Sequence, residues 1–103
     1  MALLDLLGRR MVLRILWELS LADEPLTFRG LQAAAQTNPS VLNKRLKELR
    51  DGRLVAHSGQ GYALSATGNE LLALILPLHG WADEWASRLK SERTKSARPT
   101  RRP

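Results

Sequence analysis

The stretch NPSVLNKRLKELRDG, residues 38–52, says most about the fold of this chain. Asn38 suits the N-cap of a helix, and Pro39 suits its first position, where the missing N–H is not needed. Gly52 is typical of a residue just past a helix end. These three residues predict a helix over 39–51.

The predicted helix has an apolar face and a polar face. At 100° per residue, three leucines share a narrow arc that would face a core: Leu42, Leu46 and Leu49. The opposite side carries polar and basic side chains: Ser40, Asn43, Lys44 and Lys47, with Arg50 at its edge. Asn and Lys can hydrogen-bond base edges, whereas Ser, Lys and Arg bind phosphates. Such a helix is therefore a candidate recognition helix for DNA.

Helices are also predicted before this segment. Leucines at three- and four-residue steps indicate a helix over residues 2–20, which Gly8 can break into a short leader and a main helix at 9–19. A connector ends at Pro25. Thr27 can then cap a helix over 28–35, preceded by only a short extended stub.

A hairpin and a long helix are predicted after it. Residues 54–58 and 62–65 read as strands around the turn Ser-Gly-Gln-Gly at 58–61. Ser65 or Thr67 opens a helix over 68–90, with a kink expected near His79 because Pro77 lies inside it. The order of elements predicts a mainly α protein with a small β-hairpin, a winged helix-turn-helix with long N- and C-terminal helices.

The positive charge is concentrated at the C-terminus. The chain has 103 residues, the length of one domain, and a net charge of +6. Six of its 16 basic residues lie from Lys90 onward, and the preceding residues are almost neutral. We expect a domain over 1–90 and a disordered basic tail over 91–103. Global basicity therefore adds little to the argument for DNA.

The chain lacks the residues that several classes of function require. There is no Cys, and His57 and His79 have no ligand partner at metal-binding spacing, so we expect no metal, no cofactor and no enzymatic activity. Asp5 and Arg9 interrupt the first apolar stretch, unlike in a signal peptide. No apolar run approaches the ~20 residues of a membrane span. We expect a cytoplasmic, nucleoid-associated protein without membrane contacts.

Four segments in order resemble HxlR-type regulators, a branch of the MarR-like winged helices. They are the first-helix run MVLRILWEL at 11–19, LTFRGL at 26–31, LNKRLKEL at 42–49 and YALSATG at 62–68. Trp81 falls where that family often has a Trp. The resemblance covers about residues 8 to 86. Two positions depart from the pattern, because the tip of the wing carries no charge and Arg53 stands between Gly52 and Leu54.

The resemblance implies a bacterial-type homodimeric regulator that binds double-stranded DNA at a two-fold operator. The residues expected to contact DNA are Thr27, Arg29, Asn38, Ser40, Asn43, Lys44, Lys47, Arg50, Arg53 and Gln60. The first and last helices would form the dimer interface through Leu3, Leu4, Leu7, Leu71, Leu74, Ile75, Leu78, Trp81 and Trp85. The surplus of leucines at both ends of the chain independently favours a dimer.

Two alternatives remain open from the sequence. The uncharged wing suits a protein-interaction module whose recognition face binds an acidic partner. The basic tail suits an architectural binder that is driven by non-specific phosphate contacts. The sequence names no operator and no small-molecule effector.

Overall fold

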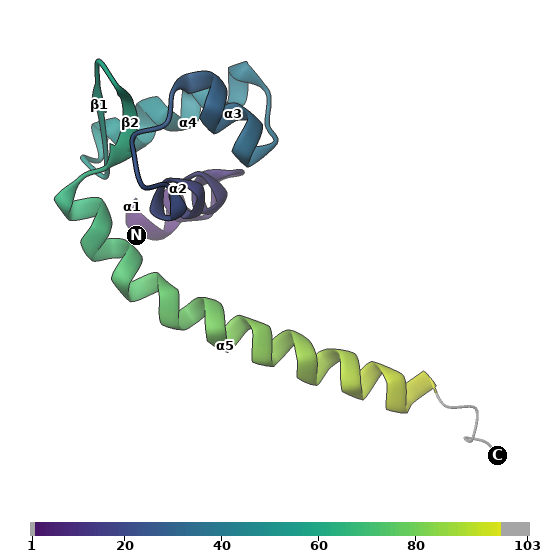
Figure 1. Ribbon diagram of the computed structural model, residues 1–103. Helices are drawn as coiled ribbons and strands as arrows, with labels where there is room; N and C mark the ends of the chain where they lie inside the picture. Colours follow the sequence, from purple (N-terminus) through teal and green to yellow (C-terminus); the bar gives the residue numbers. More distant parts are fainter. Residues whose placement is uncertain (1, 98–103) are drawn as a thin grey trace. The chain divides into compact units, whose positions relative to one another are not determined.

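The computed structural model describes residues 2–97, and the elements follow the predicted order (Figure 1). They are α1 (Ala2–Leu7), α2 (Val12–Leu21), α3 (Phe28–Ala35), α4 (Pro39–Asp51), β1 (Val55–Ser58), β2 (Gly61–Leu64) and α5 (Ala66–Ala97). Residues up to Leu72 form one compact unit, and α5 from Ala73 onward forms a second.

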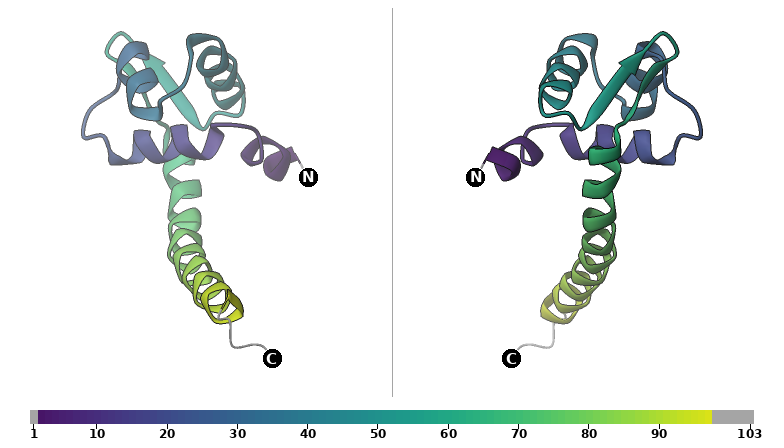
Figure 2. Two further views of the ribbon diagram at one scale, coloured as in Figure 1. Left: turned by 90° about the vertical axis from the view of Figure 1, so that its right-hand side faces the viewer. Right: turned by 90° about the vertical axis from the view of Figure 1, so that its left-hand side faces the viewer.

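The core of the first unit is built from leucines and other apolar side chains. In each view α2 lies across one side of the unit, with α3, α4 and the hairpin on the other (Figures 1 and 2). Among the described residues, no polar or charged side chain is buried. The core consists of Val12, Ile15, Leu16, Leu19, Leu31, Ala35, Leu42, Leu46, Leu49, Leu54, Val55, Tyr62 and Leu72.

Side-chain caps fix the starts of α3 and α4. Thr27 Oγ1 accepts a hydrogen bond of 3.0 Å from the backbone N–H of Gly30, and Asn38 Oδ1 accepts one of 2.8 Å from that of Val41. Each bond satisfies one of the backbone donors that a helix leaves open at its first turn. The bounds of both helices agree with those predicted from the sequence.

The hairpin is short and is joined to the segment before α3. Its strands pair antiparallel from Val55 with Leu64 to Ser58 with Gly61, so only Gly59 and Gln60 form the tip. Leu26 and Tyr62 exchange backbone hydrogen bonds of 2.9 and 2.7 Å. The short extended segment predicted before α3 therefore forms a β-bridge with β2 through Leu26.

α4 ends at Gly52 as predicted, but Gly52 is not the left-handed residue of the turn that follows. Gly52 keeps a right-handed conformation, and the left-handed residue is Arg53, with φ 60°. Arg53 N–H donates to the carbonyl of Arg50, and Leu54 N–H donates to that of Leu49, both at 2.9 Å. This is the Schellman pattern, in which the left-handed position usually belongs to Gly. Arg53 occupies it instead.

The start of α5 is tied to this same turn. Ser65 caps the helix by accepting from Gly68 N–H at 3.0 Å, and its hydroxyl donates to the carbonyl of Arg53 at 2.6 Å. A Cβ at Gly68 would overlap the carbonyl oxygen of Leu54. Only glycine therefore lets the first turn of α5 approach the backbone that enters β1.

The structure differs from the sequence prediction at the start of α2 and at the end of α5. The N-terminal helix is broken over residues 8–11, where Met11 has φ 74°, so the main helix begins at Val12 rather than residue 9. The α5 helix runs without interruption past Pro77 to Ala97, whereas the prediction placed disorder from residue 91. No Gly or Pro lies in 91–97, and extending a formed helix costs little. The rest of the predicted tail, residues 98–103, lies outside the described residues.

Candidate nucleic-acid interface

One face of α4 is exposed and polar along its whole length. Leu42, Leu46 and Leu49 are buried and hold the helix to the core. The opposite side chains are exposed, as the sequence predicted: Ser40, Asn43, Lys44, Lys47 and Arg50. Asn43 and Lys44 make no hydrogen bond or ion pair through their side chains to any described residue, so their polar groups remain available to a partner.

The remaining candidate residues lie in different places. Thr27 and Asn38 are exposed, but their side-chain oxygens already serve as helix caps. Arg29 is exposed on α3 and lines a separate shallow hollow with Gln32 and Gln36. Gln60 is exposed at the tip of the hairpin, where its N–H donates to Ser58 Oγ.

A groove brings together three of the candidate cations, Lys47, Arg50 and Arg53. It has a volume of about 740 Å³ and lies between the end of α4, strand β1 and the first turn of α5. Its remaining lining residues are Asp51, Val55, Ala56, His57, Ser65, Ala66 and Thr67. The position of the start of α5 beside these cations was not predicted from the sequence.

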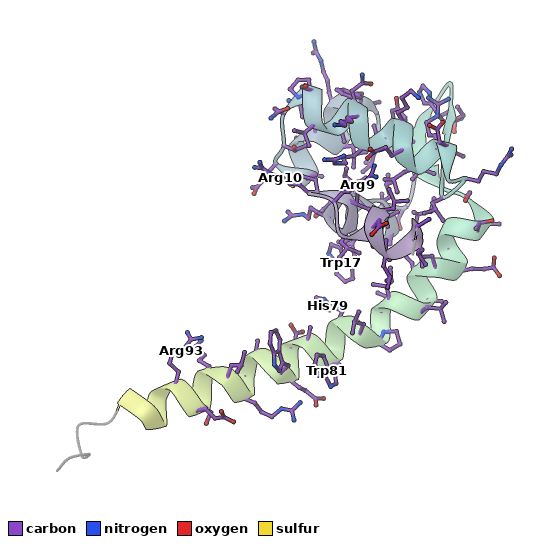
Figure 3. The ribbon with its side chains drawn as sticks, turned by 180° about the vertical axis from the view of Figure 1, so that it is seen from behind. Arg9, Arg10, Trp17, His79, Trp81 and Arg93 are labelled. Carbon is purple, nitrogen blue, oxygen red and sulfur yellow. The ribbon has the colours of Figure 1, made fainter. Side chains whose placement is uncertain are left out.

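Glu48 links α4 to the segment between α1 and α2. Its carboxylate accepts from Arg45 Nη1 at 2.8 Å and forms an ion pair with Arg9. Arg45 Nε in turn donates to the backbone carbonyl of Arg10 at 2.9 Å. Figure 3 shows Arg9 and Arg10 on that connecting segment. This network was missed in the sequence, because only the three-residue spacing of Arg45 and Glu48 was visible there.

Replacement of Glu48 with Gln should lower stability in a pH-dependent way. The hydrogen bond from Arg45, with the charges of Arg9 and Arg45, holds the pKa of the Glu48 carboxyl below its ordinary value of 4.5. A carboxyl group whose pKa is lower in the folded state than in the unfolded state stabilises the fold at pH values above its unfolded pKa. This stabilisation is lost as the pH falls through the folded pKa. The difference in free energy of unfolding between the wild type and Glu48→Gln should therefore be full at pH 7 and shrink below about pH 4.5.

Urea unfolding followed by circular dichroism at several pH values would check this prediction. Glu84→Gln is a suitable control, because Glu84 is exposed and forms no ion pair with a described residue. We expect that control to change stability at pH 7 by less than about 0.5 kcal/mol. A Glu48→Gln effect of equal size at pH 7 and pH 3 would show that the charge of Glu48 contributes nothing.

Two solved structures of known proteins are similar to this chain. No family model matches the chain, and no curated protein matches its sequence. A possible HxlR family transcriptional factor from Thermoplasma volcanium GSS1 has a similar structure, with a TM-score of 0.73 and 26% identity over 82% of this chain and 81% of that one. The chain is a winged helix-turn-helix protein whose fold is similar to those of HxlR and MarR regulators. A MarR family transcriptional regulator from Silicibacter pomeroyi DSS is also similar, with a TM-score of 0.63 and 25% identity. That match covers 96% of this chain and 65% of the other.

This winged helix-turn-helix chain shares its fold with two proteins of one functional class. One is described as a possible transcriptional factor and the other as a transcriptional regulator, neither of which is a class of enzyme, in accord with the prediction made from the sequence. Within residues 2–97 there is no group of three or more side chains able to hold a metal ion. None of the helices in the described part of the chain combines the length and apolar character needed to cross a bilayer.

The predicted dimer residues of the chain divide into two groups. Leu7 and Leu71 pack partly against the core of the first unit, and Ile75 is half-buried. The others are exposed: Leu3, Leu4, Leu74, Leu78, Trp81 and Trp85. The two Trp rings stack with centroids 6.0 Å apart, and Trp81 projects from α5 in Figure 3. Four leucines outside this predicted set are also exposed: Leu13, Leu21, Leu76 and Leu89.

Proposed function

We propose that this protein is a homodimeric transcriptional regulator that binds double-stranded DNA in a sequence-specific manner. The observation that carries the proposal is the polarity of α4, which is held to the core by three leucines and presents Asn43 and Lys44 to solvent. The two similar structures, a transcriptional factor and a transcriptional regulator, support the same class of function.

In this proposal α4 enters the major groove. The major groove admits an α-helix, and the N-terminal residues of a recognition helix contact base edges. Ser40, Asn43 and Lys44 lie in the first half of α4 and would face the bases. Arg29 on α3 and Gln60 on the hairpin would contact the sugar-phosphate backbone of the DNA. Thr27 and Asn38 would orient their helices, because their oxygens are used as caps.

The homodimer in this proposal is formed by α1 and α5. Five apolar residues of α5 repeat at steps of three and four, which is the spacing of a helix–helix seam: Leu71, Leu74, Leu78, Trp81 and Trp85. Leu74 is 76% exposed and Leu78 is 58% exposed. A soluble protein rarely leaves such a row uncovered, so a second copy is the expected partner.

Replacement of Leu78 with Asp should convert the dimer into a monomer. A charged group in an apolar seam loses its hydration without gaining a partner. Leu76 is a matched control, since it is also exposed but lies about 200° away around the helix. Sedimentation velocity at micromolar concentration should show a dimer for the wild type and Leu76→Asp, and a monomer for Leu78→Asp. Equal dissociation by both variants, or a monomeric wild type, would contradict the proposed seam.

A protein-interaction module is the second candidate. The tip of the wing, Gly59 and Gln60, carries no charge, which is unusual for a wing that grips DNA. If α4 instead recognises an acidic protein surface, DNA binding should be absent at about 0.15 M salt, a condition at which specific DNA binders remain bound.

Selection of bound fragments from a genomic DNA library tests the proposal. A variant with the basic residues of the C-terminus changed to Gln would be selected in parallel: Lys90, Arg93, Lys95, Arg98, Arg101 and Arg102. Enrichment of one palindrome by both proteins is the expected result. No enrichment by the wild type would overturn the proposal, and enrichment lost only in the variant would favour the architectural binder.

A further inference from the structure

We infer that the groove between α4, β1 and α5 is a phosphate-binding site that takes the DNA backbone and replaces the missing basic wing. The inference rests on the proposed function and adds a second DNA-binding surface to it. The groove collects Lys47, Arg50 and Arg53 beside the first turn of a helix, with one carboxylate, Asp51, among them.

The charge of the groove is largely uncompensated. Asp51 pairs with Lys47, with 3.4 Å between Oδ2 and Nζ. The guanidinium groups of Arg50 and Arg53 form no ion pair or hydrogen bond with a described residue. Two unpaired arginines therefore face one open hollow, and a planar guanidinium can bind the oxygens of a phosphate in a bidentate manner.

Backbone donors lie in the same groove. Ser65 caps α5 through Gly68 N–H, which leaves the N–H groups of Ala66 and Thr67 without an acceptor inside the helix. Free N–H groups at the start of a helix favour an anion. Together with the arginines, they supply donors from two different elements to one hollow.

The turn after α4 places a cation, Arg53, at a position that usually belongs to glycine. A side chain at φ 60° is disfavoured, and a glycine would satisfy the same turn. Here the turn leads directly from α4 into the hairpin, and a cation stands at the base of a hairpin whose tip has none.

The length of α4 places the groove where the DNA backbone should lie. From Ser40 to Arg50 the helix rises about 15 Å. The major groove is only about 12 Å wide. If the first half of α4 contacts bases, its far end therefore reaches the rim, where phosphates and not base edges are presented.

The test compares Arg50→Gln/Arg53→Gly with Arg88→Gln, which removes a cation outside the groove. Binding would be measured on the selected palindrome and on random DNA across a range of salt concentrations. The double variant should lose about tenfold affinity on both DNAs at 0.15 M salt, and its salt slope should fall by about 0.9 for each phosphate that is no longer neutralised. Arg53→Gly alone should raise Tm by a few degrees while weakening DNA binding, because glycine relieves the left-handed turn.

Other outcomes separate the two proposals. Unchanged affinity and salt slope in the double variant, with a wild type that binds its palindrome, would overturn the groove and leave the proposed function intact. Loss confined to the palindrome would also overturn it, since the arginines would then read bases. A wild type that binds no DNA would overturn the proposed function and with it the assignment to the DNA backbone.

A titration with inorganic phosphate, followed by amide NMR, distinguishes the source of the anion. Shifts of Ala66 and Thr67 that vanish in the double variant are expected at high phosphate concentration only. Saturation at low phosphate concentration, with DNA affinity unaffected by the double variant, would show a small-anion site and contradict the assignment to the DNA backbone.

Discussion

Replacement of Gly68 with Ala should unfold a large part of the protein population. An added Cβ would overlap the carbonyl oxygen of Leu54 and press on the side chain of Leu64. Neither the first turn of α5 nor the start of β1 can move away easily, since Ser65 N–H donates to that same carbonyl at 3.0 Å. We expect a loss of about 3 kcal/mol or more, against a total stability of roughly 5–10 kcal/mol for a domain of this size.

Gly80 provides a matched control within the same helix. Nothing lies within 4 Å of a Cβ built at Gly80, so Gly80→Ala should stabilise α5 by about 0.5–1 kcal/mol. Urea unfolding followed by circular dichroism measures both variants. Wild-type stability of Gly68→Ala would show that α5 does not approach the turn after α4 as described.

Replacement of Asn43 or Lys44 with Ala should weaken binding to the selected palindrome far more than binding to random DNA. Both side chains are exposed on the first half of α4, and neither has a partner among the described residues. If they contact base edges, each substitution should cost roughly 1–3 kcal/mol on the specific site, or about 5- to 150-fold in affinity. Fluorescence anisotropy with labelled duplexes measures the two affinities directly.

Asn69→Ala is the corresponding control, because Asn69 is also an exposed helical Asn but lies on α5. It should leave both affinities unchanged. Equal losses on specific and random DNA for Asn43→Ala and Lys44→Ala would show that these side chains bind phosphate alone. That result would remove the claim that α4 reads the sequence.

Helix caps, leucine spacing and turn residues in the sequence correctly predicted α4 and the hairpin, because these elements are determined by interactions between neighbouring residues. The bounds of α4 follow from Asn38, Pro39 and the leucine spacing, because caps and periodicity act within a few residues. The hairpin likewise follows from its turn residues. The exposed polar face of α4 could therefore be predicted correctly from the sequence.

Features that depend on tertiary contacts were not predicted. α4 ends at Gly52 as expected, but the left-handed residue of the turn is Arg53, one position later, where Leu54 can reach the core. The groove needs α4, β1 and the start of α5 side by side, and the ion pair of Arg9 with Glu48 joins residues 39 positions apart. The end of α5 was misplaced because composition alone was used to judge residues 91–97.

The most direct test of the account is a dimethyl sulfate protection experiment on the selected palindrome. This reagent methylates guanine at N7, an atom that lies in the major groove. If a recognition helix from each protomer enters the major groove, the full-length protein should protect guanine N7 in two tracts about 34 Å apart, on one face of the duplex. Protection that is restricted to adenine N3 in the minor groove, or the absence of any protected guanine in a bound site, would contradict the claim that α4 enters the major groove.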